Sequence, residues 1–218
     1  MTFPYLTPME RNVTSQNGED GVIEYILSAI GEGNKVTVEF GAADGKWLSN
    51  TWSLENLKGW RRWLFEGASS APGVTQAYLT VENINEEFDK AGVPEDIDVL
   101  SIDVDGNDLW LWKALKRRAR LVVIEYNGNI PPPQAVAIQY NPDHRWDQTS
   151  YFGATLSALD IVARSKGLRL VHTTLCNAFF LSEEEAKKAG MRRLPPLWEA
   201  KAIHTPDQSI RPWVVITE

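Results

Sequence analysis

Acidic and amide side chains follow two apolar segments of this chain, at the point where each segment ends. Asp103 and Asp105 lie in the sequence SIDVDGND, and Glu125 and Asn127 lie in VIEYN. Asp103 and Asp105 are two residues apart, so in an extended chain they point to the same side. If both segments are neighbouring strands, the four side chains converge. Three carboxylates in one cleft then require a cation or a shifted pKa.

Three functions of this acidic group stay open. A hard divalent cation such as Mg²⁺ could bind Asp103, Asp105, Glu125 and Asn127 and lower the pKa of an acceptor hydroxyl. One carboxylate could instead take the proton itself as a general base. In the third, Asp103 only hydrogen-bonds the backbone or a ligand amino group, and Glu125 pairs with an arginine. A calcium EF-hand is excluded, because the spacing lacks its glycine at position six and its glutamate at position twelve.

The histidines and the cysteine differ in their surroundings. His144 lies in the long segment 127–152, which has little periodicity and follows a strand, so we expect this segment to cover an acceptor pocket and His144 to be a candidate base. His172 lies within a strand and His204 in a proline-bearing tail, and both are expected to be structural. Cys176, in a turn, carries no sign of activation.

A glycine-rich turn, VEFGAADG, follows the first apolar strand. Small residues here let the backbone pass close under a nucleoside. Glu66 ends the next strand, 21 residues after Gly45, where an acidic side chain accepts hydrogen bonds from ribose hydroxyls. The GxGxxG fingerprint of dinucleotide sites is absent, and the next helix begins several residues later. Together these features predict a site for a nucleoside-containing cofactor.

The elements that must position these residues are alternating strands and helices. Strands are expected at 35–40, 62–66, 76–81, 97–103 and 120–126, with an antiparallel pair at 168–173 and 177–181. Helices are expected at 18–30, 50–58, 84–91, 108–117 and 154–166. The expected N-caps are Ser49 or Asn50 for the second helix, Asn83 (in a capping box with Glu86) for the third, and Asn107 or Asp108 for the fourth. Gly59 is expected to end the second helix. This alternation predicts an α/β fold with a mostly parallel sheet. One domain, 1–218, is expected, comprising an N-terminal helix and lid (1–34), an acceptor-side loop (127–152) and a tail (194–218) that adds a strand or packs over a face.

The composition narrows the class of protein. The 218 residues include 22 Lys and Arg against 29 Asp and Glu, a net charge of −7, which disfavours non-specific nucleic-acid binding. The basic cluster from Lys116 to Arg120 is expected to be a solvated helix end. A single cysteine cannot form an intramolecular disulfide, so a reducing, cytoplasmic setting is expected. No leader peptide or membrane span is expected, and the chain is expected to be soluble.

Several short sequence motifs, in this order along the chain, resemble those of a known family. They are SQNGED at 15–20, VEFGAADG at 38–45, ENIN at 82–85, SIDVDGND at 101–108, VIEYN at 123–127, YFGATLSAL at 151–159 and NAFFL at 177–181. The chain resembles the FkbM-like branch of class I methyltransferases that use S-adenosylmethionine (SAM). Ala43 departs from the pattern, because it stands where the family has a middle glycine.

This resemblance implies a Rossmann-like class I methyltransferase sandwich, whose seven-stranded sheet ends in a reversed hairpin. It implies O-methylation of a small molecule, sugar or glycan, with Gly41 and Asp44 near the methionine part of SAM, Glu66 at the ribose, Asn83 and Ile84 at the adenine, and Gln16 and Asn17 in a lid. The expected cofactor-binding residues are Gln16, Asn17, Glu39, Gly41, Ala42, Ala43, Asp44, Gly45, Glu66, Gly67, Asn83, Ile84, Asp103 and Val104. The rivals are a nicotinamide-dependent oxidoreductase and a non-catalytic SAM-binding module. RNA methylation is disfavoured by the acidic charge.

Overall fold

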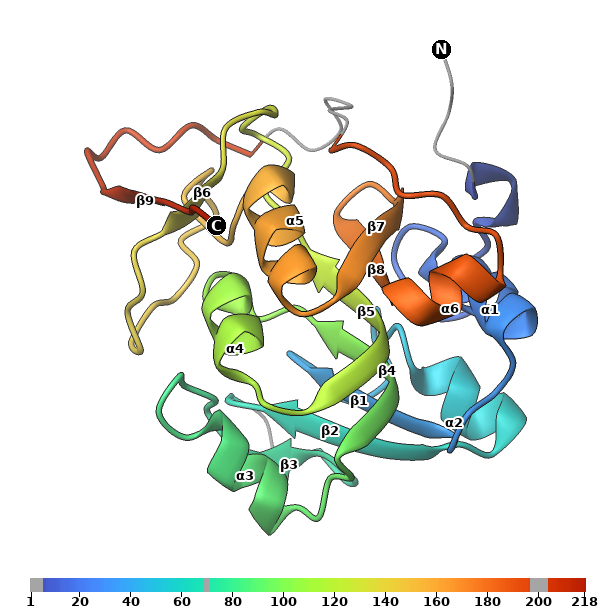
Figure 1. Cartoon of the computed structure of the whole chain (residues 1–218). Helices are drawn as coiled ribbons and strands as arrows, with labels where there is room; N and C mark the ends of the chain where they lie inside the picture. Colours follow the sequence, from blue (N-terminus) through green and yellow to red (C-terminus); the bar gives the residue numbers. More distant parts are fainter. Residues whose placement is uncertain (1–5, 69–70, 197–203) are drawn as a thin grey trace.

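The computed structural model describes residues 6–68, 71–196 and 204–218 (Figure 1). Its strands are β1 (Val36–Phe40), β2 (Arg61–Glu66), β3 (Thr75–Gln76), β4 (Asp96–Ile102), β5 (Arg118–Glu125), β6 (Val136–Ile138), β7 (Leu168–Thr173), β8 (Asn177–Ser182) and β9 (Trp213–Val215). Its helices are the 3-10 helix η1 (Thr7–Met9) and the α-helices α1 (Glu19–Ile30), α2 (Trp52–Lys58), α3 (Ile84–Lys90), α4 (Asp108–Ala114), α5 (Leu156–Ser165) and α6 (Glu183–Lys188).

Seven strands form one sheet in the order β3-β2-β1-β4-β5-β8-β7. The pairs among β1 to β5 are parallel, whereas β8 runs antiparallel to both β5 and β7. The central position of β1, with the order reversing between β1 and β4, places a switch point at the carboxyl ends of those strands. This order, with its reversed last hairpin, is the predicted seven-stranded, mostly parallel sheet, and the predicted α/β fold class is confirmed.

Helices cover both faces of the sheet (Figure 1). Alternate residues of β5 explain this, because Val122 and Ile124 pack in one core with α3, α4 and α5. Leu121 and Val123 pack in the other core, with α1 and α2. A strand buried on both faces reads as a continuous apolar run, which is how this strand appears in the sequence.

Two elements are shorter than the sequence predicts, for local reasons. The strand expected at 76–81 ends at Gln76. The chain turns away from the sheet there, because the Asn83 side chain donates to the carbonyl of Tyr78 and accepts the N–H of Thr80. These bonds occupy the Asn83 side chain, so the expected capping box is wrong, although Asn83 is the N-cap of α3. Helix α4 ends at Ala114 instead of Arg117, since Asn85 bonds both the Ala114 carbonyl and the Lys116 N–H.

The N-cap of α2 is Thr51, one residue after Asn50 and two after Ser49, the predicted positions. Ser49 nevertheless supplies the capping interaction, because its Oγ accepts the N–H of Trp52 at 3.0 Å. Gly59 ends the helix in the left-handed conformation, as predicted.

The segment expected to be a structureless loop at 127–152 contains a strand. β6 pairs antiparallel with β9, so Val136 lies opposite Val215 in a separate two-stranded sheet. The tail therefore does add a strand, although 197–203 lie outside the described residues. Among the described residues, no helix has both the length and the apolar character needed to cross a bilayer.

Candidate active site

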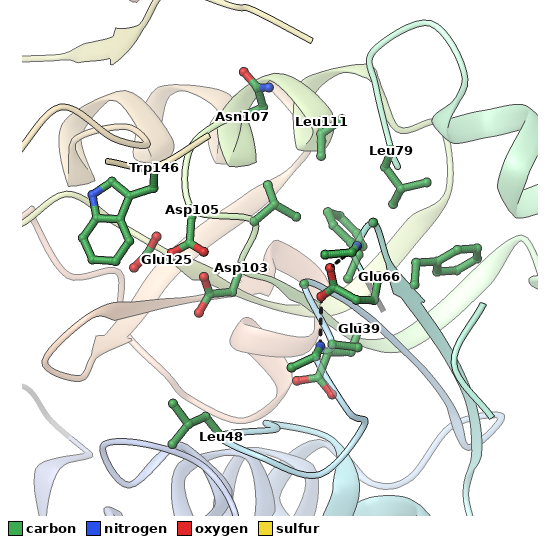
Figure 2. A pocket seen from close by; sticks show the side chains of 18 of the residues that line it. Glu39, Leu48, Glu66, Leu79, Asp103, Asp105, Asn107, Leu111, Glu125 and Trp146 are labelled. Atoms are coloured by element: carbon green, nitrogen blue, oxygen red, sulfur yellow. Dashed lines mark hydrogen bonds between the residues drawn. The ribbon is translucent and has the colours of Figure 1, made fainter. Parts of the chain in front are cut away.

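A cleft of about 620 Å³ opens at the carboxyl ends of β1, β2, β4 and β5. Parallel strands end at one edge of a sheet, so residues far apart in sequence meet there. Figure 2 shows Asp103, Asp105 and Glu125 on the side of Trp146, and Glu66 on the side of Leu79. The cleft therefore has two halves, an acidic half beside the segment after β5 and a half bounded by Glu66.

The turn after β1 depends on Gly41. Its φ is +77°, and a Cβ built there would lie 1.4 Å from the carbonyl oxygen of Asp103. Only glycine lets the ends of β1 and β4 approach so closely. Two residues later, Ala43 also adopts a left-handed conformation, with φ 47°. Such a conformation is costly for alanine, so the surrounding structure must hold it.

Glu66 holds this turn. Its Oε2 accepts the N–H of Ala43 at 3.0 Å, and its Oε1 accepts the N–H of Ala68 at 2.9 Å. The carboxylate is thereby fixed at the edge of the cleft. Each oxygen keeps a lone pair for a further donor. Phe65, Ala77 and Leu79 supply apolar wall beside it.

Glu39 lies at the floor of the cleft as part of a compensated network. It pairs with Arg62 at 3.0 Å, and both side chains are almost fully buried. Its oxygens also accept the hydroxyls of Ser49 and Thr51 and the N–H of Asn50. These contacts join β1 to the start of α2, so Glu39 supports the turn as well as lining the cleft.

The structure brings ten of the fourteen predicted cofactor-binding residues to the cleft. They are Gln16, Asn17, Glu39, Gly41, Ala42, Ala43, Glu66, Gly67, Asp103 and Val104. Gln16 and Asn17 reach it from the segment before α1, where Asn17 Nδ2 lies 3.0 Å from Cys176 Sγ. Burial, together with the charges of nearby acids, raises the pKa of the Cys176 thiol, which therefore stays protonated.

Four predicted residues lie elsewhere. Asp44 points outward and accepts the N–H groups of Lys46 and Trp47, and Gly45 packs against Leu64. Ile84 is fully buried in the core beneath α3. Asn83 is engaged by the turn before α3. Tyr78 and Leu79 line the cleft on that side, because the early end of β3 turns them inward.

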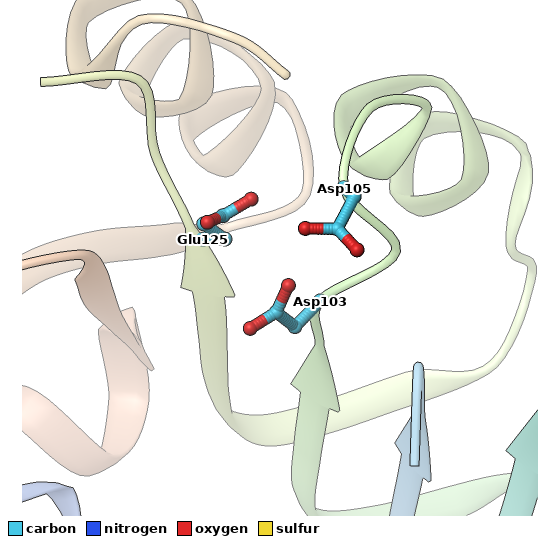
Figure 3. A group of neighbouring side chains, drawn as sticks. All are labelled: Asp103, Asp105 and Glu125. Atoms are coloured by element: carbon cyan, nitrogen blue, oxygen red, sulfur yellow. The ribbon is translucent and has the colours of Figure 1, made fainter. Parts of the chain in front are cut away.

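Asp103, Asp105 and Glu125 face one another (Figure 3), and each offers an oxygen within 4.8 Å of those of the other two. Asp103 follows β4, Asp105 adopts a left-handed φ of 56°, and Glu125 ends β5. Asp108 supports this turn by accepting the N–H groups of Val104 and Gly106, both at 2.8 Å. The carboxylate group predicted from the sequence is therefore assembled, and we call it the acidic triad.

The acidic triad has no lysine or arginine partner among the described residues. The expectation that Glu125 pairs with an arginine is therefore not met. Glu125 Oε2 is buried and has no hydrogen-bond partner among the described residues. Burial, and then the neighbouring carboxylates, raise the pKa values of Asp103 and Glu125 well above their usual range. Burial and Glu66 raise the pKa of Asp105. Burial raises the pKa of Asp108 to about 6.

Asn127, predicted as a fourth ligand of a metal, does not line the cleft. Its Nδ2 donates to the carbonyls of Ser150 and Phe152 at 2.9 and 2.8 Å, and its Oδ1 accepts from Asn129. Because the buried carboxamide is fully used, Asn127 ties the two ends of the segment after β5 together. Its role is structural.

His144 lines the acidic half of the cleft, as predicted. Burial lowers its pKa, so the imidazole is neutral at neutral pH. Its Nε2 is buried and has no hydrogen-bond partner among the described residues. A neutral imidazole can accept a proton, but this nitrogen lies against the backbone of Gly106, where a Cβ would be 2.7 Å from it.

His204, expected to be only structural, also lines the cleft. Its N–H donates to Asn129 Oδ1 at 2.9 Å, and its ring packs edge-on against Trp146 and Phe152. The tail thus contributes to the wall of the acidic half. The sequence offered no signal for this, because the approach depends on the pairing of β6 with β9.

Comparisons with known proteins give matches only among solved structures. No family model matches the sequence. No curated protein matches it. The N-terminal domain of EvdMO1, in the presence of SAH (S-adenosylhomocysteine) and D-fucose, is similar at 14% identity and a TM-score of 0.46, over 75% of this chain and 82% of that chain. The same domain with SAH bound gives 15% identity and a TM-score of 0.46, over 78% and 81%.

Proposed function

We propose that this protein is a SAM-dependent methyltransferase that methylates an oxygen of a small-molecule or carbohydrate acceptor. The observation that carries the proposal is the placement of a fixed carboxylate, Glu66, opposite the acidic triad in one cleft at the switch point of the sheet. The sequence motifs that resemble the FkbM-like family support O-methylation in particular. The single cysteine is compatible with a reducing, cytoplasmic compartment.

The residues of the cleft fit the cofactor. Glu66 has lone pairs free for ribose hydroxyls, and Phe65, Ala77 and Leu79 offer apolar wall for a nucleobase. Gly41 lets the end of β1 lie directly against Asp103 at the end of β4. When bound, SAM supplies a methyl group on a sulfonium, which is electrophilic and carries positive charge. The uncompensated acidic triad suits a cationic centre nearby.

The chain's own residues then have to orient the acceptor and take its proton. An acceptor hydroxyl in the acidic half lies between the triad and His144. The imidazole of His144 or an ionised carboxylate of the triad would take the hydroxyl proton as the acceptor oxygen bonds to the methyl carbon, while the methyl carbon–sulfur bond breaks and SAH leaves. Alignment and exclusion of water by the 127–152 segment supply most of the remaining rate gain.

A divalent cation is the second route to the same end. Three carboxylates without a cationic partner among the described residues are a hard oxygen donor set of the kind Mg²⁺ prefers. Asp103, Asp105 and Glu125 would hold the ion, and the ion would lower the pKa of the acceptor hydroxyl. Asn127 is not part of this set.

A methylation assay with radiolabelled SAM and a panel of hexoses, deoxyhexoses and glycosides tests the proposal. We expect product with at least one acceptor, and a loss of at least about 100-fold in Asp103→Asn and Glu125→Gln. Repeating the assay in EDTA and then with added Mg²⁺ separates the two routes. Activity that depends on a cation should be lost in EDTA and restored by Mg²⁺, whereas activity that depends on a side-chain base should not change. Binding of NAD in place of SAH would favour the oxidoreductase, although α2 begins too late to offer its N-terminus to a pyrophosphate.

A SAM-binding module without turnover is the second candidate. The raised pKa values favour it, because Asp103 and Glu125 are poor bases when protonated. No described residue hydrogen-bonds His144 Nε2 to orient it. SAH binding that survives Asp103→Asn, with no product from any acceptor in the unmutated protein, would support the module.

A further inference from the structure

Tyr78 stands between the two halves of the cleft. It lines the cleft beside Gly67, where a Cβ would lie 2.5 Å from Cδ2 of the Tyr78 ring. The side chain is 39% exposed, so it has a face open to a ligand. A nucleoside held by Glu66 would lie beside Tyr78, since Gly67 directly follows Glu66 and packs against the ring.

The other end of Tyr78 is bound to the segment after β5. Its phenolic O–H donates to the carbonyl of His144 at 3.0 Å. The guanidinium of Arg145 donates to the phenolic oxygen and lies over the ring, 4.1 Å from its centroid. The position of the ring therefore sets the position of the backbone at 144–145.

His144 is held from the opposite side by the turn that carries Asp105. A Cβ at Gly106 would lie 2.2 Å from His144 Cδ2, so the imidazole packs directly on the backbone of that turn. Asn107 Nδ2 donates to the carbonyl of Asn141 at 2.8 Å and fixes the same segment. A displacement of Tyr78 thus changes how His144 sits against the acidic triad.

A second tie joins the same two segments outside the cleft. The Tyr140 hydroxyl donates to Glu82 Oε2 at 2.6 Å and accepts the N–H of Val81 at 3.1 Å. With Tyr78 it connects residues 78–82 to residues 140–145 at two points. The two segments are therefore expected to move together.

We propose that Tyr78 is a positioning residue, which transmits occupation of the Glu66 half of the cleft to His144 in the acidic half. This inference rests on the proposed function, because the ligand of the Glu66 half is taken to be the adenosyl group. The transmission runs through the phenolic hydroxyl, whereas contact with the nucleoside uses the ring. Tyr78→Phe separates the two, since it keeps the ring and removes the hydroxyl.

Hydrogen exchange with SAH as the probe tests this. In the unmutated protein we expect SAH to slow exchange of the 141–147 amides by about fivefold or more. This is the size of effect that one net hydrogen bond has on an opening equilibrium. Tyr78→Phe should bind SAH within about threefold of the unmutated affinity, but SAH should slow exchange at 141–147 by less than about twofold. Arg145→Gln should behave in the same way. The NMR signal of the His144 ring should respond to SAH only when the hydroxyl is present.

Tyr151→Phe is the matched control. Its hydroxyl bonds the carbonyl of Pro212 within the acceptor side and does not reach residues 78–82, so SAH protection should persist. Unchanged protection in both Tyr78→Phe and Arg145→Gln, with SAH bound, would overturn the positioning role and leave the proposed function standing. Failure of the unmutated protein to bind SAH would overturn the proposed function and this inference with it.

Discussion

The N–H of Ala43 donates to the Glu66 carboxylate at 3.0 Å, which joins the turn after β1 to the end of β2. One residue therefore both stabilises the left-handed turn and presents a carboxylate to the cleft. Since Ala43 stands where the family pattern has glycine, this bond compensates for a conformation that alanine adopts at a cost. The turn and the Glu66 carboxylate are a single structural unit.

Glu66→Ala should weaken SAH binding by about 10- to 100-fold, because a hydrogen bond to a charged carboxylate is worth roughly 1.5–3 kcal/mol. Isothermal titration calorimetry measures the change. Glu184→Gln, an exposed acid on α6, is the control and should bind SAH as the unmutated protein does. Equal affinities in Glu66→Ala and the control would remove Glu66 from the cofactor site.

Gly41→Ala should destabilise the fold strongly, because the new Cβ would overlap the Asp103 carbonyl. Gly73→Ala is a matched control, since Gly73 has a similar φ of +81° but open space around its Cβ position. The control should lose about 1–2 kcal/mol from the left-handed conformation alone. Gly41→Ala should lose at least about 2 kcal/mol more in denaturant unfolding. Similar losses would mean that the close approach of β1 and β4 does not matter.

The acidic triad should make the free protein less stable as the pH rises. Asp103 and Glu125 have raised pKa values in the folded state and values of about 4 when unfolded. Between those values the folded state binds more protons, so the free energy of unfolding falls with increasing pH. Glu125→Gln removes one such group. It should therefore be more stable than the unmutated protein at pH 8 and gain little at pH 4.

Denaturant unfolding in EDTA at several pH values checks this prediction. Asp108 also titrates near pH 6 in the unmutated protein, so the informative quantity is the difference between the two proteins. Glu183→Gln is a useful control, because the Arg169 pairing lowers the pKa of Glu183 and the sign of its effect is opposite. A difference between Glu125→Gln and the unmutated protein that does not grow with pH would contradict the raised pKa of Glu125.

Asn127→Ala should destabilise the protein by about 2–4 kcal/mol, because two buried carbonyls lose their donor. SAH affinity should change by less than about twofold, since Asn127 does not line the cleft. Asn56→Ala, which removes an exposed bond on α2, should change stability by less than about 0.5 kcal/mol. A large loss of SAH affinity in Asn127→Ala at a temperature where it is folded would contradict this structural role.

The periodicity of apolar residues and the residue types predicted most of the fold. The apolar strands at β1, β4 and β5 bury both faces, so their sequences are continuous runs, and the short spacing between β7 and β8 fixed their antiparallel pairing. Helix ends were less predictable. α4 stops where it does because of Asn85, a residue 29 positions before Ala114 in the chain, and local sequence carries no sign of that contact.

The candidate site divides in the same way. Glu66 and Glu125 end strands, and Asp103 and Asp105 lie within three residues of a strand end; the position of a strand end is a local property of the sequence. Asn127 and Asn83 are polar residues of the same apparent kind, but backbone groups of distant segments use their side chains. Tyr78 and His204 reach the cleft through tertiary contacts alone. Which polar residues face a ligand therefore depends on what the neighbouring segments leave unsatisfied.

A crystal structure with SAH tests the central claim most directly. We predict the adenosyl ribose within hydrogen-bond distance of the Glu66 carboxylate and the sulfur facing Asp103 and Glu125. A nucleoside bound away from Glu66, or a cleft left empty at saturating SAH, would contradict the account.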